Sequence, residues 1–336
     1  MCFGFFARQR APRRVQRYRC THCGRCFSER TFALGYWLKR PDLLRPVYEG
    51  LVACAAYRQL ARAFGVSPST IMNLAARLGR HGLLFLQAGR PETAGDEALV
   101  VDGFESFEFS QYYPLHVNLA VGAESHFLYA FTDAELRRKG RMTPRQRRKR
   151  ALEERGHGRP DPAAVEKQMA ELVRLVAPSG SRVRIRSDEH RAYPRAFRRV
   201  AEVQVHHECT PSKAARTARN PLFPVNRMDL LARHCQANHK RETIAYSKRR
   251  ASLMERFAVF AVWNNWQKSR SEKRRDATPA QALGLVERRL GTPEILATRL
   301  FPSRIRLPAR WQRYYDREIP TRRIPNGSRH QLRYAY

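Results

Sequence analysis

Two aspartates directly follow short apolar runs of the sequence. Asp102 comes after residues 99–101 (LVV), and Asp188 comes after residues 183–187 (VRIRS). Such runs are typical of core strands, so each carboxylate is expected where a strand ends. Converging carboxylates repel each other unless a cation neutralises them, and their oxygens suit Mg²⁺ or Mn²⁺. We therefore predict a divalent-metal site at Asp102 and Asp188, where two metals could support phosphoryl transfer; ordinary turn chemistry is the alternative.

Cysteines near the N-terminus form a second group of candidate ligands. Cys20 and Cys23 have the C-x-x-C spacing of a zinc knuckle, and Cys26 and Cys2 are the other nearby thiols. A structural zinc site needs four ligands, usually from two knuckles. These four thiols could bind Zn²⁺ together, or they could be reduced and unliganded. The odd total of seven cysteines argues against a disulfide framework and fits a reducing cytosol.

The elements that would position the aspartates can be placed from hydrophobic patterning. Strands are predicted at 98–109, 115–122, 126–133, 182–188 and 202–208. Helices are predicted from Thr143-Pro144, at 161–176 and 191–200, and at 226–266 in one or two pieces. Three strands in succession predict an antiparallel meander, and the later strands, each reached through a helix, should add in parallel. The chain is thus expected to be α+β and multidomain, with a mixed five-stranded sheet in the order of a ribonuclease H-like core.

A polar break at 88–97 predicts the main domain boundary. We expect a partial zinc-ribbon-like segment at 1–35, a helix-turn-helix domain at 36–90, a catalytic domain at 96–270 with a basic helical insertion at 134–160, and basic C-terminal helices with a tail at 271–336. In the helix-turn-helix, Gly65 suits the turn. The second helix would present four side chains to a major groove: Ser69, Thr70, Asn73 and Arg77. An ordinary helical hairpin is the alternative.

Charge points to a polyanionic partner. The 64 Lys and Arg against 30 Asp and Glu give 64 − 30 = +34, a charge that nucleic acid would neutralise. At 43% hydrophobic residues the chain is not a disordered basic tail, and it has no apolar run of membrane-spanning length and no secretory signal. The segment 137–150 is predicted to contact phosphates through Arg137, Arg138, Arg147 and Arg148. Aromatic residues of the tail could stack on bases: Trp311, Tyr314, Tyr315, Tyr334 and Tyr336.

Several blocks of the sequence, in order, resemble the DDE transposases of the bacterial insertion-sequence-one type. They are GFFARQRAPRRVQRYRCTHCGRCFSERTF, YRQLARAFGVSPSTIMNLAARLGRH, VVDGFESFEFS, RSDEHRAYP, NRMDLLARHCQANHKRETIAYSKRR and VFAVWNNWQKSRSEKRRDATPAQALGL. The resemblance implies a zinc ribbon, a helix-turn-helix and a ribonuclease H-like core. It implies an enzyme that cuts element ends and joins their 3′-hydroxyls to target DNA, with Asp102 and Asp188 as catalytic metal ligands.

The same resemblance implies double-stranded DNA as partner, at element ends and target. It also implies a homodimer or higher assembly on that DNA, and a cytoplasmic, nucleoid-associated protein without a membrane. Two alternatives stay open. The chain could be a ribonuclease H-like nuclease that never transfers strands, or an inactive, domesticated protein that binds specific DNA sequences.

The chain departs from the family at two places. The family's third acidic residue, a Glu, aligns with Asn226, counted back from residues 243–247 (TIAYS). Asn226 could offer its amide oxygen, or cap a helix; Asp229, one helical turn on, could supply the charge, as could Glu255 or Glu242. The family's first zinc knuckle lies upstream of the GFF segment, where only Cys2 stands here. Translation could begin upstream, the chain could be truncated, or the four cysteines could form a site of their own.

Overall fold

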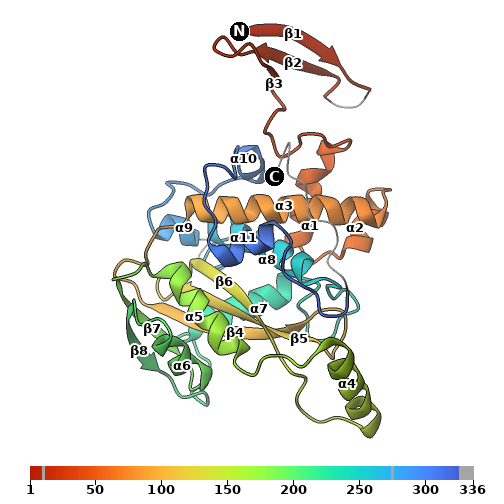
Figure 1. The fold of residues 1–336 in the computed structure, drawn as a ribbon. Coiled ribbons are helices and arrows are strands. Elements are labelled where there is room, and N and C mark those ends of the chain that lie inside the picture. Colours follow the sequence, from red (N-terminus) through yellow and green to blue (C-terminus); the bar gives the residue numbers. More distant parts are fainter. Residues whose placement is uncertain (10–11, 274–275, 325–336) are drawn as a thin grey trace.

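The computed structural model describes residues 1–9, 12–273 and 276–324. In these ranges the chain forms two separate β-sheets, and most helices surround the larger one (Figure 1). The smaller sheet is antiparallel and contains β1 (Cys2–Ala7), β2 (Arg14–Arg19) and β3 (Cys26–Ser28). It stands apart from the rest of the molecule at the N-terminal end. The protein is therefore α+β.

The larger sheet is mixed and has five strands, as predicted. Its order is β6-β5-β4-β7-β8. The strands are β4 (Leu99–Phe107), β5 (Pro114–Gly122), β6 (Leu128–Glu135), β7 (Arg182–Ser187) and β8 (Gln204–Cys209). The first three form an antiparallel meander, while β7 and β8 join β4 in parallel. β4 is thus the central strand, between the meander and the parallel pair.

Helices cover both faces of this sheet. α5 (Ala164–Val176) lies on one face, where the Thr132 hydroxyl of β6 donates to the carbonyl of Gln168 at 2.9 Å. α7 (Phe223–Cys235) and α8 (Arg250–Trp266) lie on the other, where Phe131 of β6 meets Phe257 with ring centroids 4.9 Å apart. Because both faces are covered, β5 and β6 are buried along almost their whole length.

A helical region precedes the sheet. It contains a short 3₁₀ turn (Pro41–Leu43), α1 (Leu44–Val52), α2 (Tyr57–Ala63) and α3 (Pro68–Gly89). Gly65 has a φ of 59° in the turn between α2 and α3, and the Ser67 side chain caps α3 by accepting from the Ser69 N–H. The first half of α3 packs with α1 and α2, whereas Leu83–Leu86 belong to the core around the larger sheet. One continuous helix therefore joins the two regions.

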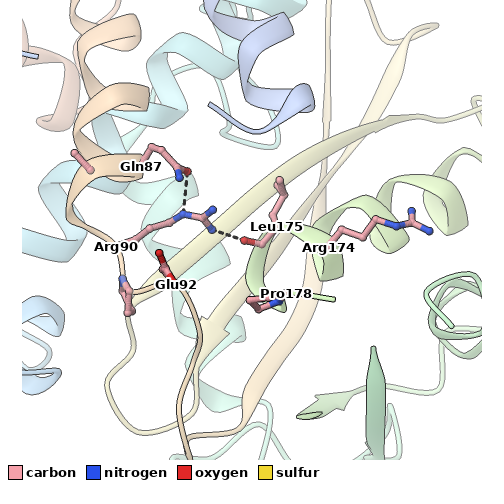
Figure 2. A pocket seen from close by; sticks show the side chains of 8 residues that line it. Gln87, Arg90, Glu92, Arg174, Leu175 and Pro178 are labelled. Atoms are coloured by element: carbon pink, nitrogen blue, oxygen red, sulfur yellow. Dashed lines mark hydrogen bonds between the residues drawn. The ribbon is translucent and has the colours of Figure 1, made fainter. Parts of the chain in front are cut away.

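The end of α3 is fastened to the sheet domain by Arg90 (Figure 2). Its guanidinium donates to Gln87 Oε1 at 3.1 Å and to the carbonyl of Leu175 near the end of α5. A cavity of about 370 Å³ lies beside this contact, lined also by Glu92, Arg174 and Pro178. None of its lining residues is a candidate metal ligand, so the cavity is separate from the predicted site.

The predicted basic insertion is helical and exposed. α4 (Pro144–His157) follows β6 and begins as predicted at Thr143, whose side chain accepts from the Gln146 N–H. No residue of α4 is buried, and the helix projects from the body of the molecule (Figure 1). An exposed helix with this charge is available to a large external partner.

The C-terminal part packs against the core. It contains α9 (Pro279–Ala282), α10 (Thr292–Ala297) and α11 (Ala309–Tyr315). The remaining helix, α6 (Ala192–Arg198), belongs to the sheet domain and connects β7 to β8. The predicted stacking role for the tail aromatics is wrong for Trp311, Tyr314 and Tyr315, which are at most 1% exposed. The Trp311 indole N–H donates to the carbonyl of Phe131 in β6. Tyr334 and Tyr336 lie outside the described residues.

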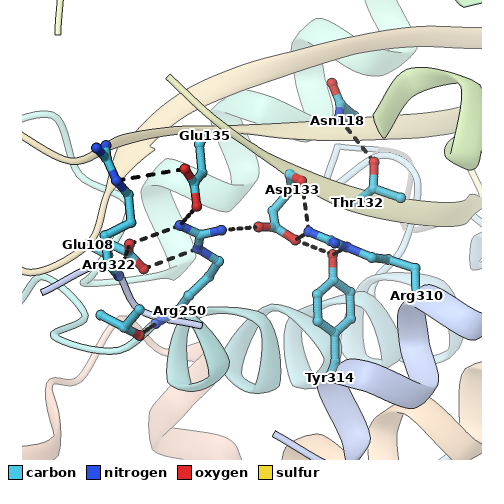
Figure 3. Close-up of polar contacts among 10 residues, drawn as sticks. Glu108, Asn118, Thr132, Asp133, Glu135, Arg250, Arg310, Tyr314 and Arg322 are labelled. Carbon is cyan, nitrogen blue, oxygen red and sulfur yellow. Dashed lines mark hydrogen bonds and ion pairs between the residues drawn. The ribbon is translucent and has the colours of Figure 1, made fainter. Parts of the chain in front are cut away.

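A buried ion-pair network holds this C-terminal part to the sheet (Figure 3). Arg250 at the start of α8 contacts the carboxylates of Glu108, Asp133 and Glu135 at distances from 2.8 to 3.4 Å. Asp133 also accepts from the guanidinium of Arg310 and the hydroxyl of Tyr314, both on α11. Although burial opposes ionisation of Asp133, the two arginines outweigh it and lower its pKa. The network compensates charges that would otherwise be costly in the core.

None of the helices in the described part of the chain combines the length and the apolar character needed to cross a bilayer.

Candidate active site

The two predicted aspartates lie side by side at the same edge of the larger sheet. In the parallel ladder between β4 and β7, Leu99 pairs with Ile185 and Val100 with Arg186. Asp102 and Asp188 are each two residues further on, so they stand level with each other. Asp102 lies on central strand β4, and Asp188 directly follows β7. Parallel neighbours thus bring together two carboxylates that are 86 positions apart in the sequence.

α7 brings the third candidate carboxylate to the same place. Asp102 points to the same face of β4 as Phe104, which packs against Phe257 of α8. α7 also packs on this face, against β4 and β5. Asp229 of α7 is near enough to Asp102 to raise its pKa electrostatically. Among the described residues, Asp229 is therefore the third acid that the fold brings to the aspartate pair.

Asn226 lies one turn before Asp229 on α7, and both side chains are half-buried. α7 begins at Phe223 with Leu222 as its N-cap residue, so the alternative of Asn226 as helix cap is wrong. Asn226 is inside the first turn, where its N–H donates to the carbonyl of Leu222 at 3.0 Å. Its side chain is on the same side of the helix as Asp229. Residue 226 is thus positioned beside the acidic group without adding charge to it.

The electrostatics of Asp102 show how close the acids are. The pKa of Asp102 is raised to about 6, first because the side chain is withdrawn from water, and further because Asp188 and Asp229 repel a second negative charge. The Tyr193 hydroxyl donates to Asp102 Oδ1 at 2.9 Å and partly offsets this rise. Asp229 also has a raised pKa because of burial, although Arg233 opposes the rise through a 2.8 Å contact. A cation placed between these acids would relieve their repulsion.

Sequence reasoning missed three polar residues at this site. Besides Tyr193 of α6, they are His116 of β5 and His190 in the turn after Asp188, whose rings lie 6.4 Å apart. The His190 N–H donates to Asp188 Oδ1 at 2.9 Å. His116 is buried, which lowers its pKa to about 4 and keeps it neutral. His190 and Tyr193 belong to the block RSDEHRAYP quoted above, so that block is the sequence signal that could have pointed to them.

Gly103 is needed beside Asp102 because His116 fills the adjacent space. A Cβ at residue 103 would lie 2.4 Å from His116 Cε1 and 2.5 Å from the carbonyl oxygen of Val117. No side chain fits at such a distance without a shift of backbone. The close approach therefore fixes how β4 and β5 pack next to the aspartates.

The donor set suits a hard divalent cation, although the ligands are not arranged around one. Carboxylate oxygens, with an amide oxygen nearby, are the ligands that Mg²⁺ or Mn²⁺ takes. Across residues 1–9, 12–273 and 276–324, however, no three His, Cys, Asp or Glu side chains are grouped so that they could hold a metal ion. Asp229 is turned to Arg233 rather than to the aspartate pair. Binding a metal with all three acids would require the Asp229 carboxylate to move closer to the aspartate pair.

Two other candidates for the third ligand lie elsewhere. Glu255 of α8 is buried against α3, where its carboxylate accepts from Arg317 at 2.6 Å and faces Arg80 at 4.0 Å. These ion pairs commit Glu255 to the helix interface, so its expected place beside the aspartates is wrong. Glu242 is exposed in the segment between α7 and α8.

The four N-terminal cysteines are free thiols that lie at different places around the small sheet. Cys20 and Cys23 lie on the turn between β2 and β3, where the Gly24 N–H donates to the carbonyl of Cys20 and Gly24 has a φ of 67°. Backbone N–H groups of Cys23 and His22, followed by the Cys23 thiol, lower the pKa of the Cys20 thiol. Cys26 and Cys2 begin β3 and β1. In the described residues these two thiols are not grouped with the first pair into a site of three or more ligands.

The predicted DNA-contacting residues divide into exposed and internally paired ones. Ser69 and Asn73 of α3 are exposed and Thr70 is half-buried, whereas Arg77 donates to the carbonyls of Leu34 and Tyr36, both at 2.8 Å. Arg77 thus supports the segment before α1, rather than reaching outward as expected.

The basic insertion shows the same division. Arg147 and Arg148 of α4 are exposed. Arg137 binds Glu154 through two contacts of 2.8 and 3.0 Å, and Arg138 donates to the carbonyl of Gln111. The exposed pair is therefore the part of this segment that is open to phosphates.

A scan against models of known protein families gives no match, and a search of curated protein sequences gives none either.

Proposed function

We propose that the chain is a DNA transposase with a ribonuclease H-like catalytic core. Asp102 and Asp188 would hold Mg²⁺ or Mn²⁺, and Asp229 would complete the acidic group with Asn226 beside it. The observation that carries the proposal is the level placement of Asp102 and Asp188 on adjacent parallel strands, with Asp229 of α7 near enough to raise the pKa of Asp102. The strand order, three antiparallel and two parallel, supports the core assignment. The net charge of +34 supports DNA as substrate.

The residues present fit the role of a metal-dependent phosphoryl-transfer site. A bound divalent cation would supply Lewis-acid stabilisation and lower the pKa of a bound water or hydroxyl. The chain's own contribution is to fix the acids on rigid elements and to limit water around Asp102. The Tyr193 hydroxyl orients the Asp102 carboxylate, and the His190 N–H orients that of Asp188. The half-buried setting strengthens every charge interaction with a phosphate group.

Two exposed parts of the chain would bind DNA. The proposal assigns α2 and α3 to duplex recognition, with Ser69 and Asn73 at the exposed start of α3. It assigns Arg147 and Arg148 of α4 to phosphates away from that duplex. Two copies on two element ends are the expected assembly. The cysteine pair would be a zinc half-site, with Zn²⁺ as a second, structural metal.

The test is metal-dependent cleavage of supercoiled plasmid by the whole chain. Asp102→Asn and Asp188→Asn should each reduce nicking in Mg²⁺ by about 100-fold or more, because each removes a charged ligand. Glu189→Gln is the matched control, since Glu189 is exposed beside Asp188 and accepts from the N–H and the hydroxyl of Ser212. Near-normal nicking by either aspartate variant would show that this residue is not catalytic.

Strand transfer separates a transposase from a nuclease of the same fold. Labelled duplexes from the DNA that flanks the gene should become covalently joined to plasmid in the presence of Mg²⁺ or Mn²⁺. Cleavage without joined product would favour the nuclease.

A DNA-binding protein without catalysis is the second candidate, and one observation favours it. Asp229 is held by Arg233, and the aligned family Glu is replaced by Asn226. Tight DNA binding without any metal-dependent nicking would favour this candidate.

A further inference from the structure

The small N-terminal sheet has two different faces. In the β1–β2 and β2–β3 ladders, Phe5 is opposite Gln16 and Tyr18 is opposite Phe27, so these four side chains share one face. The other face contains Val15 and Ser28, which are buried. The Val15 face is therefore partly covered, although Phe6 opposite Val15 is 39% exposed, and the face of Phe5 and Phe27 is open to solvent.

The open face is aromatic. Phe5 is 49% exposed and Phe27 is 45% exposed, which is unusual for side chains of this size that lie in a sheet. Tyr18 and Phe27 are stacked with ring centroids 5.4 Å apart and an angle of 24° between their planes. The guanidinium of Arg14 lies 3.8 Å above the ring of Phe5. We call the set of Phe5, Arg14, Tyr18 and Phe27 the aromatic face.

Charge indicates what could cover this face. Residues 1–30 contain eight arginines and one glutamate, Glu29. A second copy of so basic a segment would be repelled, and an apolar protein surface would leave the arginines without counter-charges. An anionic lipid surface would neutralise the arginines, but it offers no flat rings to the aromatic side chains. A polymer that has both flat apolar rings and regular negative charges matches the aromatic face and its surroundings. Nucleic acid has both features.

We propose that the aromatic face binds unpaired DNA, with bases stacked on Phe5, Tyr18 and Phe27 and with Arg14 near the phosphates. Bases in a duplex are already stacked on each other and present only their edges, so they would not reach the rings. Unpaired bases expose their faces, and stacking on aromatic side chains tolerates any sequence. This site is separate from the aspartates and does not rest on the proposed catalytic activity.

The experiment compares two oligomers of equal charge. The full chain is titrated into fluorescently labelled oligothymidylate of about 12 nucleotides, and into an abasic oligomer of the same length, at several salt concentrations. Binding is measured by fluorescence anisotropy. The chain should bind the thymidine oligomer about 10-fold more tightly or better, because only that oligomer can stack. Equal affinity for the two oligomers would overturn the proposal.

Variants assign the difference to the aromatic face. Phe5→Ala and Phe27→Ala should each lose about 10-fold affinity for the thymidine oligomer and little for the abasic one. The loss should be the same at every salt concentration, since stacking releases no counterions. Phe5→Trp and Phe27→Trp should retain binding. Trp37→Ala is the control, because Trp37 is 69% exposed but lies outside the sheet.

Two other outcomes would overturn the proposal. Equal losses on both oligomers would mean that the phenyl rings only support the sheet. A dimer seen in sedimentation velocity for the wild-type chain and abolished by Phe5→Ala would assign the aromatic face to a second copy of the chain.

Discussion

The Asp102 carboxylate lies where burial and two neighbouring acids all favour its protonated form. Its pKa in the folded chain is about 6, against an ordinary value of 3.8. The folded state therefore binds this proton more tightly than the unfolded state. Asp102 contributes stability below about pH 3.8 that is lost as pH rises through 6. Without a cation, the ionised Asp102 carboxylate therefore destabilises the folded protein at neutral pH.

Asp102→Asn should therefore stabilise the protein at neutral pH. A rise in pKa from 3.8 to about 6 corresponds to about 3 kcal/mol, which is the upper limit of the gain at pH 7.5. Near pH 4 the variant and the wild-type protein should have nearly equal free energies of unfolding. Urea unfolding at several pH values measures this difference. Parallel pH profiles for the two proteins would contradict the assignment of the raised pKa to Asp102.

Asp229 and Asn226 give a second prediction at the residue scale. If Asp229 supplies the third carboxylate, Asp229→Ala should lower Mg²⁺-dependent nicking by about 100-fold, while Asn226→Ala should cost less. Asn226→Glu restores the residue that the resemblance implies and should lower the Mg²⁺ concentration needed for half-maximal nicking. The metal titration of each variant is the measurement. Unchanged metal dependence in Asp229→Ala would remove Asp229 from the site.

At the scale of elements, the basic insertion has exposed arginines on α4 and an internally paired arginine, Arg137, before that helix. Arg147→Ala and Arg148→Ala should each reduce the slope of log K against log salt for duplex binding by about 1, because each would remove one phosphate contact. Arg137→Ala is the comparison, since Arg137 is held by Glu154. Anisotropy at several salt concentrations gives the slopes. A slope that stays the same in both α4 variants would show that the helix does not contact DNA.

Elements with local signals were predictable. The apolar run at 99–101, which opens β4, and the Thr143-Pro144 pair that opens α4 are encoded within a few residues. These signals were enough for the mixed five-stranded sheet, and the sheet then brings Asp102 and Asp188 together. α7 begins at Phe223, three residues before the expected start at Asn226, because Leu222 rather than Asn226 occupies the N-cap position.

The side chains whose positions differ from the sequence-based expectation have partners far away in the sequence. Arg77 reaches carbonyls at Leu34 and Tyr36, 43 and 41 positions away, and Glu255 pairs with Arg317, 62 positions away. Neither partner is visible from local patterning. The burial of the tail aromatics was not predictable for the same reason, since the Trp311 indole contacts Phe131 in β6, which precedes it by 180 positions.

At the scale of the whole molecule, the Arg250 network fixes the C-terminal part to the sheet. Arg250→Met would leave buried Glu108 and Asp133 and half-buried Glu135 with less positive charge, and we expect it to cost roughly 3–5 kcal/mol of stability. Arg313→Met on the exposed side of α11 is the control and should change stability by less than about 0.5 kcal/mol. Urea unfolding of the full chain measures both. A small effect of Arg250→Met would mean that the remaining arginines, Arg310 beside Asp133 and Arg322 beside Glu135, are enough to compensate these acids.

This network also bears on the order in which a newly made chain can fold. Asp133 of β6 is separated from Arg310 and Tyr314 by 177 and 181 positions. During synthesis β6 leaves the ribosome long before α11 does, and until then its buried acid lacks two of its partners. We expect the larger sheet to reach its final packing only when translation is nearly complete. The small sheet, whose ladders close within the first 28 residues, can form much earlier. A nascent chain would therefore have its basic, aromatic end folded before its acidic centre is assembled.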